Sequence, residues 1–208
     1  MKSMPLSDAQ RDVLTELGNI GISRAARQLS SLLNEPIHIA VPRVEFCSAS
    51  EASGKCLDSK GGELACVYQR MSGDLTGRIA LLLPSGDSHL LFQDLLGHAA
   101  PLQGLDLRAF EHEAMTEIGN ILISSCVSAM ADMLELRIDV SVPRYAEATA
   151  QDLFNDTAPD REEQPALLIH TRLTAARRDL EGSIVLLLSA AAAEKVMFAV
   201  QALILAAD

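Results

Sequence analysis

The spacing of hydrophobic residues divides the first half of the chain into five predicted elements. Apolar residues recur at helical intervals from about Ser7 to Asn34, and serine is a residue type that caps helix starts. The chain then alternates between apolar and polar positions, as a half-buried strand does. In order, this half predicts a helix at 7–34, a strand at 36–48, a polar loop at 51–62, a hairpin of Glu63–Met71 and Asp74–Leu83 turning at Ser72 and Gly73, and a helix at 85–96.

The second half repeats this order of elements. It predicts a helix at 107–134, a strand at 137–145, a polar insert at 146–163, a hairpin of 166–173 and 180–188, and a closing helix at 190–205. The segment 75–83 aligns with 180–188 at an offset of 105 residues. We therefore interpret the chain as one domain over 1–208, built from internal repeats at about 7–100 and 107–206.

Each repeat supplies only three strands, and a sheet that small leaves edges that a second repeat can cover. The expected fold class is therefore α+β. Two pseudo-two-fold related units of helix, three strands and helix would share one six-stranded, mainly antiparallel sheet covered by helices.

The composition narrows the range of partners. The net charge is −11, and the chain has no tryptophan and only two tyrosines. Nucleic-acid binding requires a basic surface or aromatic stacking residues, so we do not expect it. The four cysteines are scattered without metal-ligand spacing, and no apolar run suggests a signal peptide or a membrane span. We expect a cytoplasmic protein that has no metal or cofactor of its own and does not insert into a membrane.

A polar motif recurs in the two long predicted helices. The first copy has two acidic residues, an amide and a distant proline, namely Asp12, Glu16, Asn19 and Pro42. The second copy has the same residue types at the same spacing, namely Glu113, Glu117, Asn120 and Pro143. The two copies lie 101 residues apart, and a match of this length favours a duplication over chance.

In each copy the carboxylates and the amide fall on one face of the helix, opposite the apolar residues. A solvated helix face explains a single copy, because exposed carboxylates and amides are common. Two features favour a binding role instead. Asparagine is a poor residue for a helix interior unless its side chain has a task, yet it recurs in both copies. Carboxylates at i and i+4 repel each other unless a cation approaches, so a basic partner is expected.

The motif contains no nucleophile, no strong base and no set of metal ligands. An asparagine side chain has both a donor and an acceptor, so it can orient a water molecule for in-line attack on a phosphoryl group held elsewhere. A neighbouring carboxylate can pair with a lysine or arginine beside that phosphoryl group. These residues favour catalysis by positioning, in a site that a partner protein completes.

The pattern Asp/Ser-x3-Glu-x2-Asn-x22-Pro resembles the signature of the CheC, CheX and FliY family of chemotaxis phosphatases. Members of this family dephosphorylate the aspartyl-phosphate of the CheY response regulator, and two copies in a chain of this length are most similar to CheC. The resemblance implies that Glu16 and Glu117 contact the active-site lysine of a phosphorylated CheY-like regulator. It implies that Asn19 and Asn120 orient the attacking water, and that any Mg²⁺ belongs to the regulator.

The first positions of the two copies, Asp12 and Glu113, are expected to take part in partner binding. Asp12 fits the family pattern, whereas Glu113 departs from it by one methylene group. On the motif alone we expect both sites to work and the first to be the stronger. The two prolines are expected to mark an edge or a break in the strand that follows each helix.

CheC-like proteins also bind the receptor deamidase CheD through a helix that follows the second motif. The resemblance places that helix within Arg144 to Asp156, where Ala148, Leu153 and Phe154 would form an apolar anchor. Two alternatives to the phosphatase stay open at this point. One is a module that binds a receiver domain without hydrolysing its phosphate, and the other is an adaptor that acts through CheD. The presence of both asparagines favours the enzyme.

Overall fold

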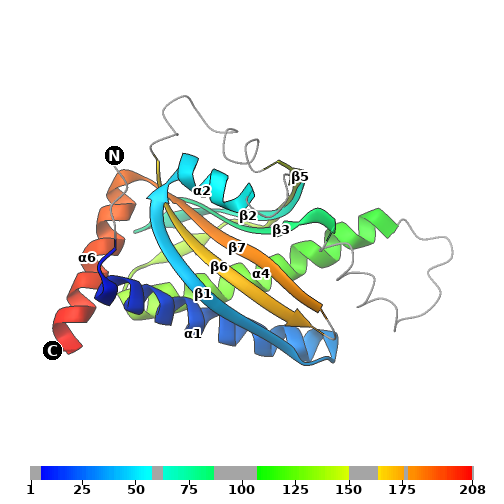
Figure 1. The fold of residues 1–208 in the computed structure, drawn as a ribbon, viewed down its shortest axis with the longest axis horizontal. Coiled ribbons are helices and arrows are strands. Elements are labelled where there is room, and N and C mark those ends of the chain that lie inside the picture. Colours follow the sequence, from blue (N-terminus) through cyan, green and yellow to red (C-terminus); the bar gives the residue numbers. More distant parts are fainter. Residues whose placement is uncertain (1–5, 58–62, 87–106, 150–163, 176–177, 208) are drawn as a thin grey trace.

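The computed structural model describes residues 6–57, 63–86, 107–149, 164–175 and 178–207. Within these ranges four helices pack on one antiparallel sheet of seven strands, which confirms the predicted α+β class (Figure 1). The helices are α1 (Asp8–Leu33), α2 (Ala49–Leu57), α4 (Leu107–Leu134) and α6 (Ala190–Ala207). The strands are β1 (Ile37–Ser48), β2 (Leu64–Gly73), β3 (Gly77–Pro84), β4 (Ile138–Val140), β5 (Arg144–Ala148), β6 (Pro165–Ala175) and β7 (Arg178–Leu188).

The sheet interlocks the two halves of the chain. Its strand order is β1-β6-β7-β3-β2-β4, and β5 also pairs with β2. The hairpins β2–β3 and β6–β7 therefore meet at the centre of the sheet, through the pairing of β3 with β7. The strand after the first long helix, β1, pairs with the hairpin of the second half, while β4 and β5 pair with the hairpin of the first half. Each half thus covers an edge of the other, so neither half has a complete sheet alone.

Local signals in the sequence explain where α1 begins and ends. The Ser7 hydroxyl accepts a hydrogen bond from the backbone N–H of Gln10 at 3.2 Å, and the Gln10 side chain accepts one from the Ser7 N–H at 3.0 Å. This reciprocal pair is a capping box. At the other end Asn34 adopts the left-handed conformation with a φ of 51°, which ends the helix. The predicted helix at 7–34 is confirmed.

The single strand predicted at 137–145 is wrong, because the chain leaves the ladder between β4 and β5 at Ser141 to Pro143. Pro143 has no N–H to donate to a neighbouring strand. Both pieces pair with β2, so the sheet has seven strands where six were predicted. Pro42 similarly lies where the pairing of β1 with β6 shifts register, between Ala40 and Arg43. Both prolines therefore mark an irregularity in the strand after a long helix, as expected from the sequence.

The predicted loop at 51–62 is wrong over its first part, where α2 forms. The Ser48 hydroxyl accepts from the Glu51 N–H at 3.2 Å, and Glu51 accepts from the Ser48 N–H at 3.0 Å. This is again a capping box, and it begins a helix whose Ala52 and Cys56 are buried one turn apart. Residues 58–62, nearly all of the helix predicted at 85–96, and the insert from residue 150 lie outside the described residues. The first hairpin turns at residues 74–76, just after the predicted position.

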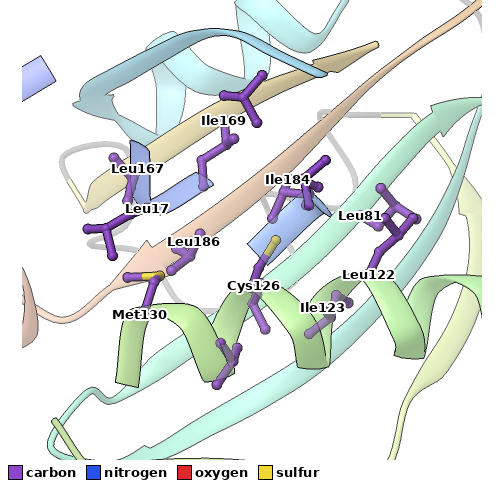
Figure 2. Packing of buried hydrophobic residues seen from close by; sticks show 14 of the residues in the cluster. Leu17, Leu81, Leu122, Ile123, Cys126, Met130, Leu167, Ile169, Ile184 and Leu186 are labelled. Atoms are coloured by element: carbon purple, nitrogen blue, oxygen red, sulfur yellow. The ribbon is translucent and has the colours of Figure 1, made fainter. Parts of the chain in front are cut away.

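Apolar side chains fill both faces of the sheet. On one face α1, α4 and α6 cover a large core, whereas α2 covers a smaller core on the other face (Figure 1). Alternate strand residues divide between the two, so Leu81 belongs to the large core and Leu82 to the small one. Figure 2 shows Cys126 and Met130 of α4 among the buried leucines and isoleucines of the sheet.

One helix of the described chain, Arg108–Leu134, is long and apolar enough to cross a membrane by length and composition alone. Of the most apolar 18-residue stretch of this helix, 56% is buried inside the fold. A core helix of a globular domain passes the same test, and the packing of α4 on the sheet accounts for its apolar character.

Candidate functional site

The two motif helices lie side by side on one face of the sheet (Figure 1). Their contact is close because position 21 has no side chain. A β-carbon at Gly21 would stand 2.8 Å from the Cα of Cys126 and 3.1 Å from the carbonyl oxygen of Ser125. The guanidinium of Arg24 in α1 also bonds to the carboxylate of Asp132 in α4 at 2.9 Å. The pairing of α1 with α4 therefore sets the relative placement of the two motif copies.

Each asparagine of the motif follows a glycine that brings its helix down onto the sheet. A β-carbon at Gly119 would stand 2.4 Å from the Cβ of Val67 in β2. At Gly18 the approach is looser, since a β-carbon there would stand 3.3 Å from the methyl groups of Val41. The asparagines therefore sit at the boundary between the buried and exposed sides of their helices, where both are half-buried.

The carboxylates of both copies are exposed, namely those of Asp12, Glu16, Glu113 and Glu117. None of the four forms an ion pair with another residue in the described part of the chain. In each copy the acidic pair is spaced one helical turn apart, so the like charges add on the same surface. The structure thus exposes the carboxylates of both motif copies, as the sequence predicts.

The two asparagines differ in their hydrogen bonds. The Oδ1 atom of Asn120 accepts a hydrogen bond from Nε2 of Gln69 at 2.9 Å and a longer one from the Ser124 hydroxyl at 3.4 Å. Asn19 has no side-chain hydrogen bond to any residue that the structure describes. Sequence reasoning did not identify Gln69. The available signal was a polar residue at a core-facing position of a predicted strand, between Val67 and Met71.

The cysteines offer no reactive thiolate in the described residues. All four are free and buried. Burial raises the pKa of Cys47 to about 11, and it raises the pKa values of Cys56, Cys66 and Cys126 to about 12. Thiols with such pKa values remain protonated near pH 7 and are poor nucleophiles. The described residues also contain no group of three or more His, Cys, Asp or Glu side chains placed to hold a metal ion.

The segment expected to bind CheD does not begin with a helix. Its first residues, Arg144–Ala148, form strand β5 and pair with β2 in the register Arg144 opposite Tyr68. These residues are therefore not part of the expected helix, because the sheet edge offers hydrogen bonds to an extended chain. The rest of the proposed anchor, Leu153 and Phe154, lies outside the described residues.

Comparison with known sequences places both motif copies in one family. A sequence model described as the CheC-like family matches residues 10–45 and 110–145, and each match contains one motif copy with its proline. The chain is 32% identical to the "CheY-P phosphatase CheC" of Bacillus subtilis (strain 168) over 145 residues, which cover 68% of each protein. It is 25% identical over 158 residues to the "Flagellar motor switch phosphatase FliY" of the same organism. That match covers 76% of this chain and 41% of the relative.

Solved structures share the architecture. The structure of FliY from Thermotoga maritima superposes with a TM-score of 0.74 at 22% identity, covering 95% of this chain and 98% of that one. The middle domain of FliM from H. pylori gives a TM-score of 0.66 at 10% identity, covering 92% and 99%. At these identities the likeness concerns the fold.

Proposed function

The chain belongs to the CheC-like family, and we propose that it is a phosphatase that hydrolyses the aspartyl-phosphate of a CheY-type response regulator. A curated relative of which it covers more than two thirds is named for that activity. The fold presents two copies of the required residues on neighbouring helices, with their carboxylates exposed and unpaired by any described residue. That exposure is the observation that carries the proposal, because the site must be completed by a second protein.

In the proposed mechanism the receiver domain supplies the phosphoryl group, its lysine and a bound Mg²⁺. Glu16 or Glu117 pairs with that lysine and fixes the orientation of the docked receiver. Asn19 or Asn120 then holds a water molecule in line with the phosphorus–oxygen bond that breaks. Asp12 and Glu113 add negative charge to the same docking face. The contribution of this chain is geometric, since orienting one water removes part of the entropic barrier to attack.

We place this reaction in the cytoplasm, where we expect the CheY-type regulator to be. We do not extend the proposal to CheD, because the described part of the segment expected to bind it is a strand of the sheet.

The test is turnover of a phosphorylated CheY-type receiver with Mg²⁺ present. Substoichiometric amounts of the purified chain are expected to accelerate loss of the phosphoryl group from the whole receiver pool. A module that binds the receiver without hydrolysis would leave the rate unchanged or slow it in proportion to the complex formed. Either of those results would reject the phosphatase.

A further inference from the structure

A buried glutamine lies beneath the second motif copy. Gln69 of β2 is only 1% exposed, on a strand whose neighbouring core-facing residues are apolar. Its Nε2 atom donates to Oδ1 of Asn120 at 2.9 Å, while no described residue forms a hydrogen bond with its Oε1 atom. A buried amide with one unsatisfied end is less favourable for folding than an apolar side chain of the same length. Stability therefore does not account for Gln69.

The hydrogen bond instead accounts for the orientation of Asn120. A carbonyl oxygen has two lone pairs, and Gln69 and Ser124 approach the same Oδ1 atom. The other hydrogen-bonding group of the Asn120 side chain is its NH₂ group, which donates to no described residue and is left for a water or phosphoryl oxygen. Because Gln69 is held in the sheet, it restricts the rotation of the Asn120 amide before any partner arrives.

Among the described residues, the first motif copy has no equivalent of Gln69. Gln69 of β2 lies opposite Ile79 of β3 in the first hairpin. At the offset of 105 residues, Ile79 corresponds to Ile184 of β7 in the second hairpin. Ile184 lies opposite Ile169 of β6, so Ile169 is the residue of the second hairpin that corresponds to Gln69. A β-carbon at Gly18, next to Asn19, would stand 3.6 Å from Ile169, which confirms that this side chain lies under the first copy. Isoleucine cannot donate a hydrogen bond, so Asn19 is not oriented in the same way.

We propose that Gln69 is a positioning residue that orients Asn120 for catalysis at the second site only. The inference rests on the proposed phosphatase function and adds an asymmetry between the two sites that the repeated motif does not contain. Orientation of the amide acts on the attack geometry rather than on docking, so it changes kcat and leaves KM in place.

The test separates the two sites with single substitutions. Asn19→Ala leaves the second site to work alone, and Asn120→Ala leaves the first. Gln69→Met keeps the length of the side chain and removes the donor. When Gln69→Met is added to the Asn19→Ala chain, kcat is expected to fall about tenfold with KM unchanged. This fall corresponds to an increase of about 1.4 kcal/mol in the activation free energy. In the Asn120→Ala chain the same substitution is expected to leave kcat unchanged, since its effect passes through Asn120.

Stability and motion provide readouts that do not depend on turnover. Gln69→Met is expected to keep or raise the melting temperature, because it removes an unsatisfied buried amide. By NMR relaxation, the side-chain NH₂ of Asn120 is expected to be more restricted than that of Asn19, and Gln69→Met is expected to remove the difference.

The proposal is overturned if Gln69→Met slows both single-site chains alike, if it slows neither, or if the two asparagine side chains are equally mobile in the wild type. Absence of phosphatase activity in the wild type would reject the proposed function. The NMR comparison would still decide whether Gln69 orients Asn120.

Discussion

Gly21 of α1 lies against the backbone of Cys126 in α4, so closely that a β-carbon at position 21 would stand 2.8 Å from the Cys126 Cα. Real β-carbons do not approach other atoms at that distance. The absence of a side chain at one position thus lets the two motif helices touch, and it sets the separation of the two candidate sites. Any residue larger than glycine must move one helix relative to the other.

Gly21→Ala is therefore expected to destabilise the protein, by about 1–3 kcal/mol for overpacking against backbone atoms. Thermal or urea unfolding measures the change. Gly54→Ala in α2 is the matched control, because a β-carbon at that position would meet no described atom within 4 Å apart from its chain neighbours and the nearby backbone of its own helix. That control is expected to be neutral or stabilising by about 0.5–1 kcal/mol, since alanine is the better helix former. Equal effects of the two substitutions would contradict the close helix contact.

Reversing the charge of both motif glutamates is expected to weaken receiver binding. Glu16→Lys with Glu117→Lys replaces attraction to a basic side chain by repulsion, and added salt is expected to weaken the wild-type complex. Calorimetric titration with a receiver domain measures both effects. A control chain carrying Glu63→Lys and Glu194→Lys has the same net charge but keeps the motif faces intact. If the two chains bind equally well, the assigned pairing is wrong.

Glu45 gives the fold a predictable response to acid. Burial opposes its charge, but hydrogen bonds from Lys55 and His170 and the nearby Arg43 outweigh that effect and hold the carboxyl pKa below its ordinary value of 4.5. The unfolded chain then binds this proton more readily than the folded chain. The stabilisation by Glu45 is therefore present above pH 4.5 and is lost as the pH falls through the lower folded pKa.

Glu45→Gln is expected to lower the free energy of unfolding at pH 7 and to flatten its decline between about pH 5 and pH 3. Urea unfolding at a series of pH values measures this dependence. An unchanged slope in the variant would show that other groups dominate the acid response.

The two sites are expected to differ in activity. The complete motif match at Asp12 favours the first site, whereas the hydrogen bond from Gln69 favours the second. The second site loses little at its first motif position, because Glu113 keeps the charge of Asp12. The first site lacks the hydrogen-bond donor that Gln69 provides at the second, because no described residue near Asn19 replaces it. We therefore expect Asn120→Ala to lose more activity than Asn19→Ala when each rate is compared with the wild type. The reverse order would refute this ranking and leave the family assignment in place.

The parts of the fold that depend on local sequence could be predicted. Ser7 with Gln10 begins α1 and Asn34 ends it through contacts within a few residues. The same kind of signal at Ser48 and Glu51 begins α2, and it was missed among small polar residues that resemble a loop. The break at Pro143 could be anticipated, because proline has no N–H to donate. The separate pairing of β4 and β5 with β2 could not be anticipated from the sequence.

The parts that depend on distant contacts could not be predicted from the pattern. Helical geometry alone predicts that Glu16 and Asn19 share one side of α1, but the half-buried position of Asn19 depends on how that helix packs on the sheet. The pairing of β1 with β6 joins the two halves through edges that each half leaves open, and no local period encodes the choice. Gln69 reaches Asn120 across 51 residues of sequence, so its role becomes visible only when β2 lies beneath α4.

The most direct test of the central claim is the rate of phosphate loss from a phosphorylated CheY-type receiver with the Asn19→Ala, Asn120→Ala double variant. Asn19 has no described hydrogen bond, whereas Asn120→Ala removes the described partner of the buried Gln69 amide, so the variant is expected to stay folded but to lose about 1–3 kcal/mol of stability. Removing both water-orienting amides is expected to slow hydrolysis about a hundredfold, which corresponds to about 2.7 kcal/mol of transition-state stabilisation. Hydrolysis at the wild-type rate by the folded double variant would contradict the account.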